Sequence, residues 1–216
     1  MTESVKQPET STPNCKCRLL TKIAIVLVVL VLISSFLAPR LIRRFERRRH
    51  HRISCVNNLK QVGLGLMIYA DENNGMFPDR KNLEVFSKVN NLIKYPAIFC
   101  CPASPQYPCK RKQKLTKGNI SYIYLGGKVE KDPSNMPIVF DYPLNYKKST
   151  GWFSKPEHYI NVLFCDGHVE SFKTEAKNCV EFIDVLHKKF KYSPEVLKRL
   201  KEKAAQADRE QVPHKR

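Results

Sequence analysis

The feature that most constrains this chain is one long apolar run near its N-terminus. The run 19–38 reads LLTKIAIVLVVLVLISSFLA and is interrupted only by Thr21, Lys22, Ser34 and Ser35. An α-helix rises about 1.5 Å per residue, so a run of this length spans a hydrocarbon core about 30 Å thick. The sequence therefore predicts a transmembrane helix over 19–38.

A cleaved signal peptide is the alternative interpretation of this run. Residues 1–18 precede it and are mostly polar, and the run is longer than the ~7–15 apolar residues of a signal peptide. Small residues that would suit a cleavage site occur only around Ser34, Ser35 and Ala38. We therefore expect a retained anchor, preceded by a disordered polar tail over 1–18.

A strongly basic segment follows the apolar run. The chain has 216 residues and a formal net charge of +18, and seven arginines lie between Arg40 and Arg52. Such a charge indicates either nucleic acid or an anionic membrane surface. Because the run abuts the predicted span and no nucleic-acid-binding motif is present, we expect lipid headgroups as the partner and no nucleic acid. The predicted membrane-surface contacts are Arg40, Arg43, Arg44, Arg47, Arg48 and Arg49.

The span continues into a second helical segment. Apolar residues recur every three or four positions after the span, which is the helical period. Pro39 is a potential kink, and Asn73, Asn74 and Gly75 predict the end of the helix. We therefore divide the chain into a tail (1–18), a transmembrane helix (19–38), a basic extension of the helix (39–75), a head (76–176) and C-terminal helices with a tail (177–216).

The head combines short strands with amphipathic helices, so the predicted fold class is α+β, with the long N-terminal helix packed on a small antiparallel sheet. Asp166-Gly167 between two apolar runs predicts a hairpin with a type I′ turn. Ser193-Pro194 predicts a helix start, and we expect the following helix, charged nearly all round, to be exposed. The predicted strands are 121–125, 137–140, 161–164 and 169–172, and the other predicted helices are 82–93 and 178–190.

Eight cysteines leave several kinds of chemistry open. Cys15 and Cys17 precede the span, where metal binding and lipidation are weak alternatives. The six that follow it suit disulfides if the head is in an oxidising compartment, or buried and free thiols if it is not. They are Cys55, Cys100, Cys101, Cys109, Cys165 and Cys179.

Our preferred disulfide is Cys101–Cys109, because a bridge between these residues would close a proline-rich loop. The alternative is a zinc site made by Cys100, Cys101 and Cys109 with Cys55 or Cys165. We disfavour it because the spacing matches no zinc module well and vicinal cysteines are awkward ligands.

Two segments carry a family resemblance. The stretch 52–63 reads RISCVNNLKQVG and is followed by MIYADENNG over 67–75, while 161–169 reads NVLFCDGHV, with Cys101-Pro102 between them. In this order the segments resemble the pseudopilin-type, type II secretion system protein G-like proteins of planctomycete and lentisphaera-type bacteria, whose C-terminal motif is His-x9-Asp-Gly. The residues that carry the resemblance are Cys55, Asn58, Leu59, Lys60, Gln61, Tyr69, Asn74, Gly75, Cys101, Pro102, His158, Asp166, Gly167 and His168.

The sequence departs from that family in two places. The family is cleaved before a Phe-Thr-Leu-Ile-Glu-like start, whereas the span here opens Leu19-Leu20-Thr21-Lys22-Ile23. Seven residues, not nine, separate His158 from Asp166. We therefore expect an N-terminus that is intact or cut only at Met1.

Two other groups of residues offer alternative sites. His158, Asp166 and His168 have the right side chains for a metal or catalytic site, and a hairpin would bring the two histidines together. Turn chemistry explains Asp166-Gly167 more simply. Pseudopilins hold calcium in a loop, but Glu130, Asp132 and Asp141 lack the alternating pattern of a calcium loop. We predict no cofactor, no metal and no enzymatic activity.

The resemblance implies a single-pass protein of the inner (cytoplasmic) membrane that acts as a non-catalytic structural or interaction subunit of a secretion or surface-filament system. Other pilin-like subunits or secretion proteins would be its partners. Positive charge beside a span is retained in the cytoplasm, which would place the head inside, whereas the resemblance places it outside; we expect it outside. The alternatives are a stand-alone membrane-anchored binding protein and, less favoured, a membrane-anchored metal-dependent enzyme.

Overall fold

The structure is a computed structural model that describes residues 15–102, 104, 106, 108–110, 113–127, 134–143 and 158–210. The chain divides into two compact units, 1–47 and 48–216. Most of the predicted tail lies outside the described residues, but residues 15–18 are helical and belong to the first helix. The predicted end of the tail at residue 18 is therefore four residues too late in this structure.

One helix, α1 (Cys15–Glu72, 58 residues), contains both the apolar run and the predicted extension. It ends where the sequence predicts, because Asn74 (φ 56°) and Gly75 (φ 76°) adopt left-handed backbone conformations. The Gly75 N–H donates to the Ala70 carbonyl at 2.8 Å, which closes the last turn.

The second unit uses the last turns of α1 as a core helix. Cys55, Leu59, Val62 and Leu66 have no exposed surface and recur at steps of four, three and four residues. This spacing gives the helix one apolar face. The amphipathic pattern of the sequence is therefore real in this part of α1.

The sheet is a four-stranded antiparallel meander in the order β1-β2-β3-β4. All four predicted strands are present, with small shifts at their ends, and the α+β class is confirmed. The strands are β1 (Tyr122–Tyr124), β2 (Pro137–Asp141), β3 (His158–Phe164) and β4 (Val169–Thr174).

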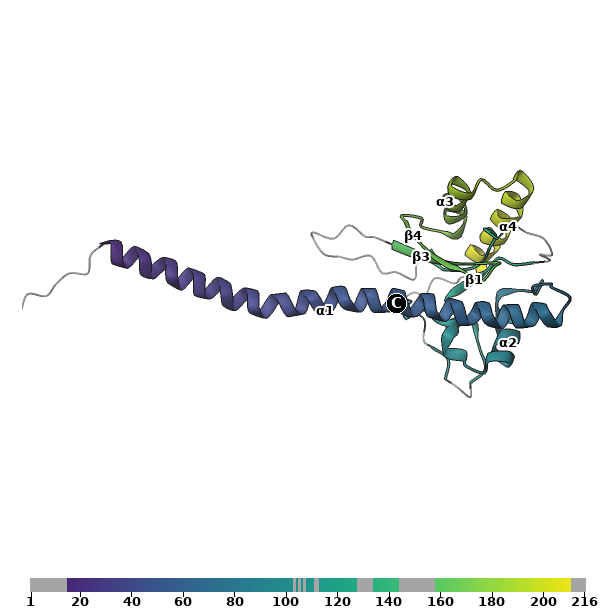
Figure 1. Cartoon of the computed structure of the whole chain (residues 1–216), viewed down its shortest axis with the longest axis horizontal. Coiled ribbons are helices and arrows are strands. Elements are labelled where there is room, and N and C mark those ends of the chain that lie inside the picture. Colours follow the sequence, from purple (N-terminus) through teal and green to yellow (C-terminus); the bar gives the residue numbers. More distant parts are fainter. Residues whose placement is uncertain are drawn as a thin grey trace, which may run out of the picture. The chain divides into compact units, whose positions relative to one another are not determined.

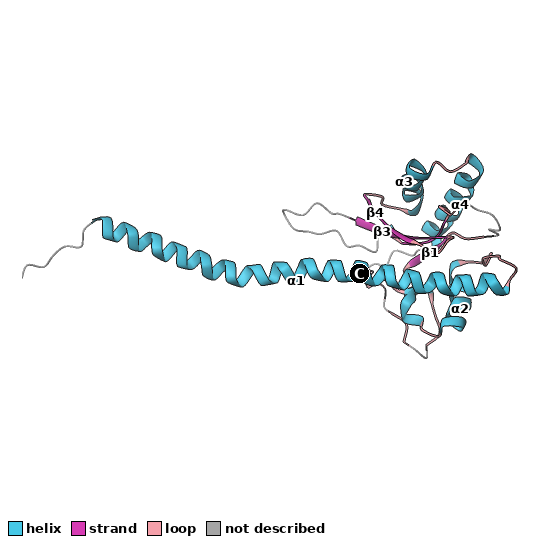
Figure 2. Ribbon diagram, viewed as in Figure 1, coloured by secondary structure: helices cyan, strands magenta, loops and turns pink. Residues whose placement is uncertain are grey.

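Helices cover both faces of this sheet (Figures 1 and 2). Tyr122 and Tyr124 contribute to the core shared with α1 and α2 (Asn82–Ile93), whereas Ile123 points to the core shared with α3 (Cys179–Phe190) and α4 (Pro194–Glu210). Such alternation follows from the two-residue period of a strand. An irregular register between Pro137 and Val139 interrupts it in β2.

Helix α4 differs from the prediction. The sequence suggests an exposed helix, yet Leu200 and Ala204 are fully buried in the core shared with α3. These two residues are four positions apart and so lie on one helical face. A narrow apolar stripe is enough to dock the helix, although charged residues fill the rest of its surface. Its predicted start is confirmed, since the Val196 N–H donates to the Ser193 hydroxyl at 3.4 Å.

The hairpin turn also differs from the prediction. Among the residues around it only Gly167 has a positive φ (85°), whereas a type I′ turn requires positive φ at both central residues. The Gly167 N–H donates to Phe164 O, and the Phe164 N–H donates to His168 O. The loop is therefore three residues long, Cys165-Asp166-Gly167, with glycine at the left-handed position of a bulge.

Candidate functional site

The apolar part of α1 is the first candidate site. Within the described part of the chain, one helical segment, Lys22–Arg40, is long and apolar enough to cross a membrane. None of that segment is buried within the protein, and Val31 and Leu32 are 65% and 64% exposed. A row of exposed branched aliphatic side chains of this length is unusual for a surface in contact with water.

The basic segment continues directly from it. Of the six predicted membrane-surface arginines, Arg40 and Arg43 have described side chains, and both are exposed. The Arg40 guanidinium lies 4.0 Å from the centre of the Phe36 ring, and Arg43 Nε donates to Pro39 O at 3.1 Å. The side chains of Arg44, Arg47, Arg48 and Arg49 lie outside the described structure.

The disulfide is the clearest correction to the sequence-based sites. Cys101 pairs with Cys55, across 46 residues of sequence, and not with Cys109. Cys109 Sγ instead approaches the Gln113 carbonyl at 3.2 Å. The proline-rich loop suggested a local bridge, but helix η1 (Pro96–Phe99) brings Cys101 against α1. The bridge thus links two elements of the core.

The sequence suggested Asp141 only as a calcium ligand, which we rejected, but the structure places it beside the disulfide. A carboxylate oxygen of Asp141 and the sulfurs of Cys55 and Cys101 all lie within 4.8 Å of one another, and all three residues are buried. Glu130 and Asp132, the other acids considered and rejected as calcium ligands, lie outside the described residues. The sequence does contain a signal for this buried acid. Asp141 directly follows the apolar strand 137–140, where a buried strand normally carries an apolar residue.

The remaining cysteines do not join this centre. Cys100 Sγ lies 3.5 Å from Ser104 Oγ and 3.4 Å from Gln106 O, and burial raises the pKa of this thiol. Burial raises the pKa of the Cys179 thiol even more strongly. Cys165 is half-buried in the hairpin loop. The predicted zinc set is therefore not brought together, and the side chains of Cys15 and Cys17 lie outside the described structure.

The histidine and aspartate alternative is only partly assembled. Asp166 Oδ1 accepts a hydrogen bond from His168 N at 3.0 Å and lies 2.5 Å from His168 Nδ1. His158 pairs with Thr174 at the opposite end of the β3–β4 hairpin, whereas His168 adjoins the loop. The antiparallel register therefore separates the two histidines.

Most residues of the predicted family motif have structural roles. Asn58 Nδ2 donates to Cys100 O at 3.3 Å, and Leu59 belongs to the core. Lys88 Nζ lies 5.2 Å from the centre of the Tyr69 ring. Lys60, Gln61 and Pro102 are exposed, and their surroundings within the described residues give no reason to assign them a catalytic or binding role.

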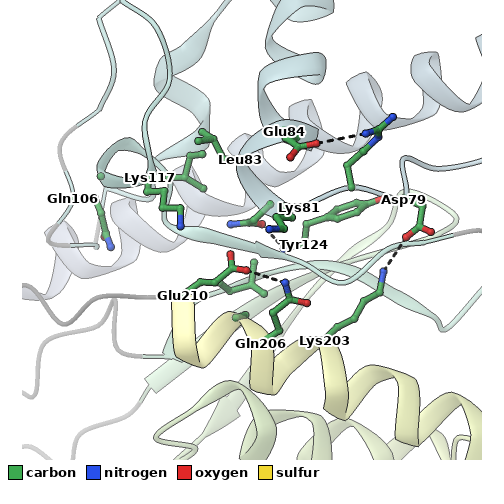
Figure 3. Close-up of a pocket in the computed structure, with 16 residues that line it drawn as sticks. Asp79, Lys81, Leu83, Glu84, Gln106, Lys117, Tyr124, Lys203, Gln206 and Glu210 are labelled. Atoms are coloured by element: carbon green, nitrogen blue, oxygen red, sulfur yellow. Dashed lines mark hydrogen bonds and ion pairs between the residues drawn. The ribbon is translucent and has the colours of Figure 1, made fainter.

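A cavity that the sequence analysis missed lies in the second unit. It has a volume of about 630 Å³ and is bounded by the start of α2, the region of helix η2 (Lys117–Asn119), β1 and the last turns of α4. Figure 3 shows Lys117, Gln206 and Glu210 projecting toward the same space, and Ile120 and Ile123 form part of its apolar lining. No motif marks it, because its residues come from four separate segments.

Charge in this cavity is mixed. Lys203 Nζ lies 3.6 Å from Asp79 Oδ1 and also donates to Gly126 O. Burial lowers the pKa of Lys203, and the nearby Asp79 carboxylate partly offsets this effect. Lys81 and Lys117 also line the cavity and form no ion pair within the described part of the chain. Asp79, Glu84 and Glu210 line it as well, so the cavity presents both signs of charge beside an apolar lining.

Comparison with known proteins gives no match: no protein-family model, no curated protein and no solved structure is significantly similar to this chain.

Proposed function

We infer that this protein is a single-pass membrane-anchored, pilin-like subunit that acts through assembly and interaction and not through catalysis. The observation that carries this inference is the construction of α1. One uninterrupted 58-residue helix is apolar and exposed in its first part and amphipathic and buried in its last turns, where it packs on an antiparallel sheet.

The exposed face of α1 in the second unit supports assembly. Leu64 and Ile68 are 61% and 38% exposed and lie one helical turn apart, on the side away from Val62 and Leu66. Exposed aliphatic residues on a helix that is otherwise well packed are suited to contact with another helix. The occupant that we propose for this face is the α1 helix of a second pilin-like subunit.

Membrane anchoring is tested by extraction. The protein should stay in the membrane fraction after high salt and after carbonate. Replacing Val28 and Leu30 with Asp should release it, because each charge near the centre of a span costs about 3 kcal/mol. Release of the unaltered protein by high salt alone would mean that the arginine segment was the only attachment.

Assembly is tested separately by cross-linking in membranes. A Leu64→Cys variant treated with a bismaleimide should give dimers and larger species, whereas the matched variant Lys188→Cys, exposed on α3, should give far fewer. Monomers only from both variants would exclude assembly through this face.

If cross-linking gave only monomers, the second candidate, a stand-alone anchored binding protein, would be favoured. The 630 Å³ cavity supports this candidate, since its apolar lining adjoins Lys81 and Lys117, which form no ion pair with the residues that the structure describes. Ligand-dependent thermal stabilisation by small carboxylates, lost in a Lys117→Glu variant, would be its signature.

A further inference from the structure

The centre formed by Cys55, Cys101 and Asp141 contains a buried carboxylate that a structural disulfide does not require. The three residues come from α1, from the segment after η1 and from the end of β2, and none has exposed surface. Their two sulfurs and one carboxylate oxygen lie within 4.8 Å of one another. Two cysteines and an acid from three elements thus converge on one buried point.

The carboxylate needs an explanation. Burying an ionised carboxylate is strongly unfavourable unless it is hydrogen-bonded or bound to a metal, and a disulfide has no use for a neighbouring negative charge. Its Oδ2 accepts hydrogen bonds from Asn161 N at 3.2 Å and from Asn161 Nδ2 at 2.6 Å. Ser171 Oγ in turn donates to Asn161 Oδ1 at 2.6 Å.

This chain of hydrogen bonds fixes the orientation of the carboxylate. Outer partners of this kind usually hold the ligands of a metal ion in place. Here the outer partners, Asn161 and Ser171, come from neighbouring strands β3 and β4, which are paired at these two residues. The sheet therefore holds Asp141 rigidly beside the sulfurs.

We propose that this centre has two states: a disulfide under oxidising conditions and, after reduction, a binding site for a divalent zinc-like ion. A dithiol supplies two electrons and two protons, the Sγ–Sγ bond breaks, two thiols form and the dithiol becomes a disulfide. Binding of the ion then displaces both thiol protons and forms two metal–sulfur bonds and one metal–oxygen bond with Asp141.

The donor set selects the ion. Two thiolates and a carboxylate suit Zn²⁺, which prefers tetrahedral coordination by sulfur, nitrogen and oxygen, and they suit Mg²⁺ or Ca²⁺ poorly. In a tetrahedral site with zinc–sulfur bonds of about 2.3 Å the two sulfurs are about 3.8 Å apart. Reduction allows this separation, and the fourth position is left to water.

Either state would join α1 to the rest of the second unit. The disulfide makes this link across 46 residues in an oxidising compartment, and the metal would make it in a reducing one. The inference does not rest on the proposed function, because it concerns only residues of the core.

The test uses the full chain in detergent. The protein is reduced with a phosphine, freed of reductant without oxygen, and titrated with Co²⁺ as a spectroscopic substitute for Zn²⁺. We expect one ion to bind, with thiolate-to-cobalt charge-transfer absorption and the visible bands of tetrahedral cobalt, and Zn²⁺ to remove both. The oxidised protein should show neither.

Three variants locate the site. Asp141→Asn, which keeps the shape of the side chain and one acceptor oxygen for the Asn161 donors, should weaken Zn²⁺ binding at least tenfold while the oxidised protein still forms the disulfide. Cys55→Ser should abolish the charge-transfer bands. Cys109→Ser removes a buried thiol outside the centre and should change nothing.

The proposal is overturned if the reduced wild type shows no thiolate–cobalt absorption, or if Asp141→Asn binds Zn²⁺ as tightly as the wild type. It is also overturned if Cys109→Ser loses the bands. Should Cys55→Ser fail to fold, the comparison of Asp141→Asn with Cys109→Ser still decides, because both variants retain Cys55 and Cys101.

Discussion

Gly167 is the residue on which the β3–β4 hairpin depends. It has a φ of 85°, and a Cβ at this position would lie 2.6 Å from Met67 Cε. A β-branched side chain is strained at positive φ, and Met67 would also have to move. Gly167→Val should therefore lower the free energy of unfolding by about 1–3 kcal/mol, measured by urea denaturation.

A second glycine provides the matched control. Gly118 has no positive φ, and a Cβ there would meet nothing closer than Thr116 Oγ1 at 3.9 Å. Gly118→Ala should change stability by no more than about 0.5 kcal/mol. Equal losses from both substitutions would mean that the left-handed backbone at Gly167 is not the cause. Asp166→Asn should be mild, because asparagine keeps the acceptor for His168 N.

At the scale of elements, the sequence predicted the features that depend on residues close together in the chain. The strands, the helix 82–93 and the end of α1 at Asn74 and Gly75 follow from side-chain period and backbone preference. The partner of Cys101, the burial of Leu200 and the cavity depend on which distant segments meet. Contacts between distant segments leave no trace in any short window of sequence. The predicted Cys101–Cys109 disulfide was wrong because it paired Cys101 with a cysteine across a local loop.

Helix α4 stabilises the start of α3 in a way that the sequence does not reveal. The Asp208 carboxylate accepts hydrogen bonds from Cys179 N at 3.0 and 3.1 Å and from Val180 N at 3.4 Å. A negative charge at a helix N-terminus is favourable, and hydrogen bonds to charged groups contribute about 1.5–3 kcal/mol. Asp208→Ala should lower the free energy of unfolding by that amount in thermal or urea denaturation.

The control for this prediction is another aspartate between the same two helices. Asp184 Oδ1 lies 2.6 Å from Lys201 Nζ, but both side chains are substantially exposed. Exposed ion pairs contribute about 0–1 kcal/mol, so Asp184→Ala should have a small effect. An Asp208→Ala variant as stable as Asp184→Ala would contradict the proposed capping of α3 by α4.

At the scale of the whole molecule, buried phenols and thiols should make the protein sensitive to alkali. Burial raises the pKa of Tyr142 from 10.0 to about 12 and raises the pKa values of Tyr124, Tyr192, Cys100 and Cys179. Below about pH 8 these groups are protonated in both the folded and the unfolded state, so their contribution to stability is complete. As the pH rises, the unfolded chain loses protons that the folded protein keeps, and stability falls.

Urea denaturation between pH 7.5 and 10.5 checks this expectation. The free energy of unfolding should decline above about pH 8, where the unfolded thiols begin to ionise. Tyr124→Phe should reduce the decline, although it also removes the hydrogen bond to Pro78 O. Tyr95→Phe, at an exposed position, should leave it unchanged. A flat profile in the wild type would contradict the prediction.

The side of the membrane on which the second unit lies is decided by competing signals. The arginines after the apolar run favour the cytoplasm, whereas the Cys55–Cys101 disulfide and the pilin-like role that we propose favour an oxidising compartment. The native cysteines of the second unit are poor reporters, because among its described residues Cys100, Cys109 and Cys179 are buried and Cys165 is half-buried. An exposed reporter is needed.

A Glu195→Cys substitution on the exposed start of α4, in a background with Cys15, Cys17 and Cys165 replaced by Ser, provides that reporter. If the unit lies outside the cytoplasmic membrane, as we propose, an impermeant maleimide should label the reporter in cells whose outer membrane alone has been permeabilised. The parent with these three cysteines replaced, which lacks the reporter, should remain unlabelled. Labelling only after the cytoplasmic membrane is broken would place the unit in the cytoplasm. The arginines would then have determined the orientation, and the reduced state of the Cys55, Cys101 and Asp141 centre would be the relevant one in the cell.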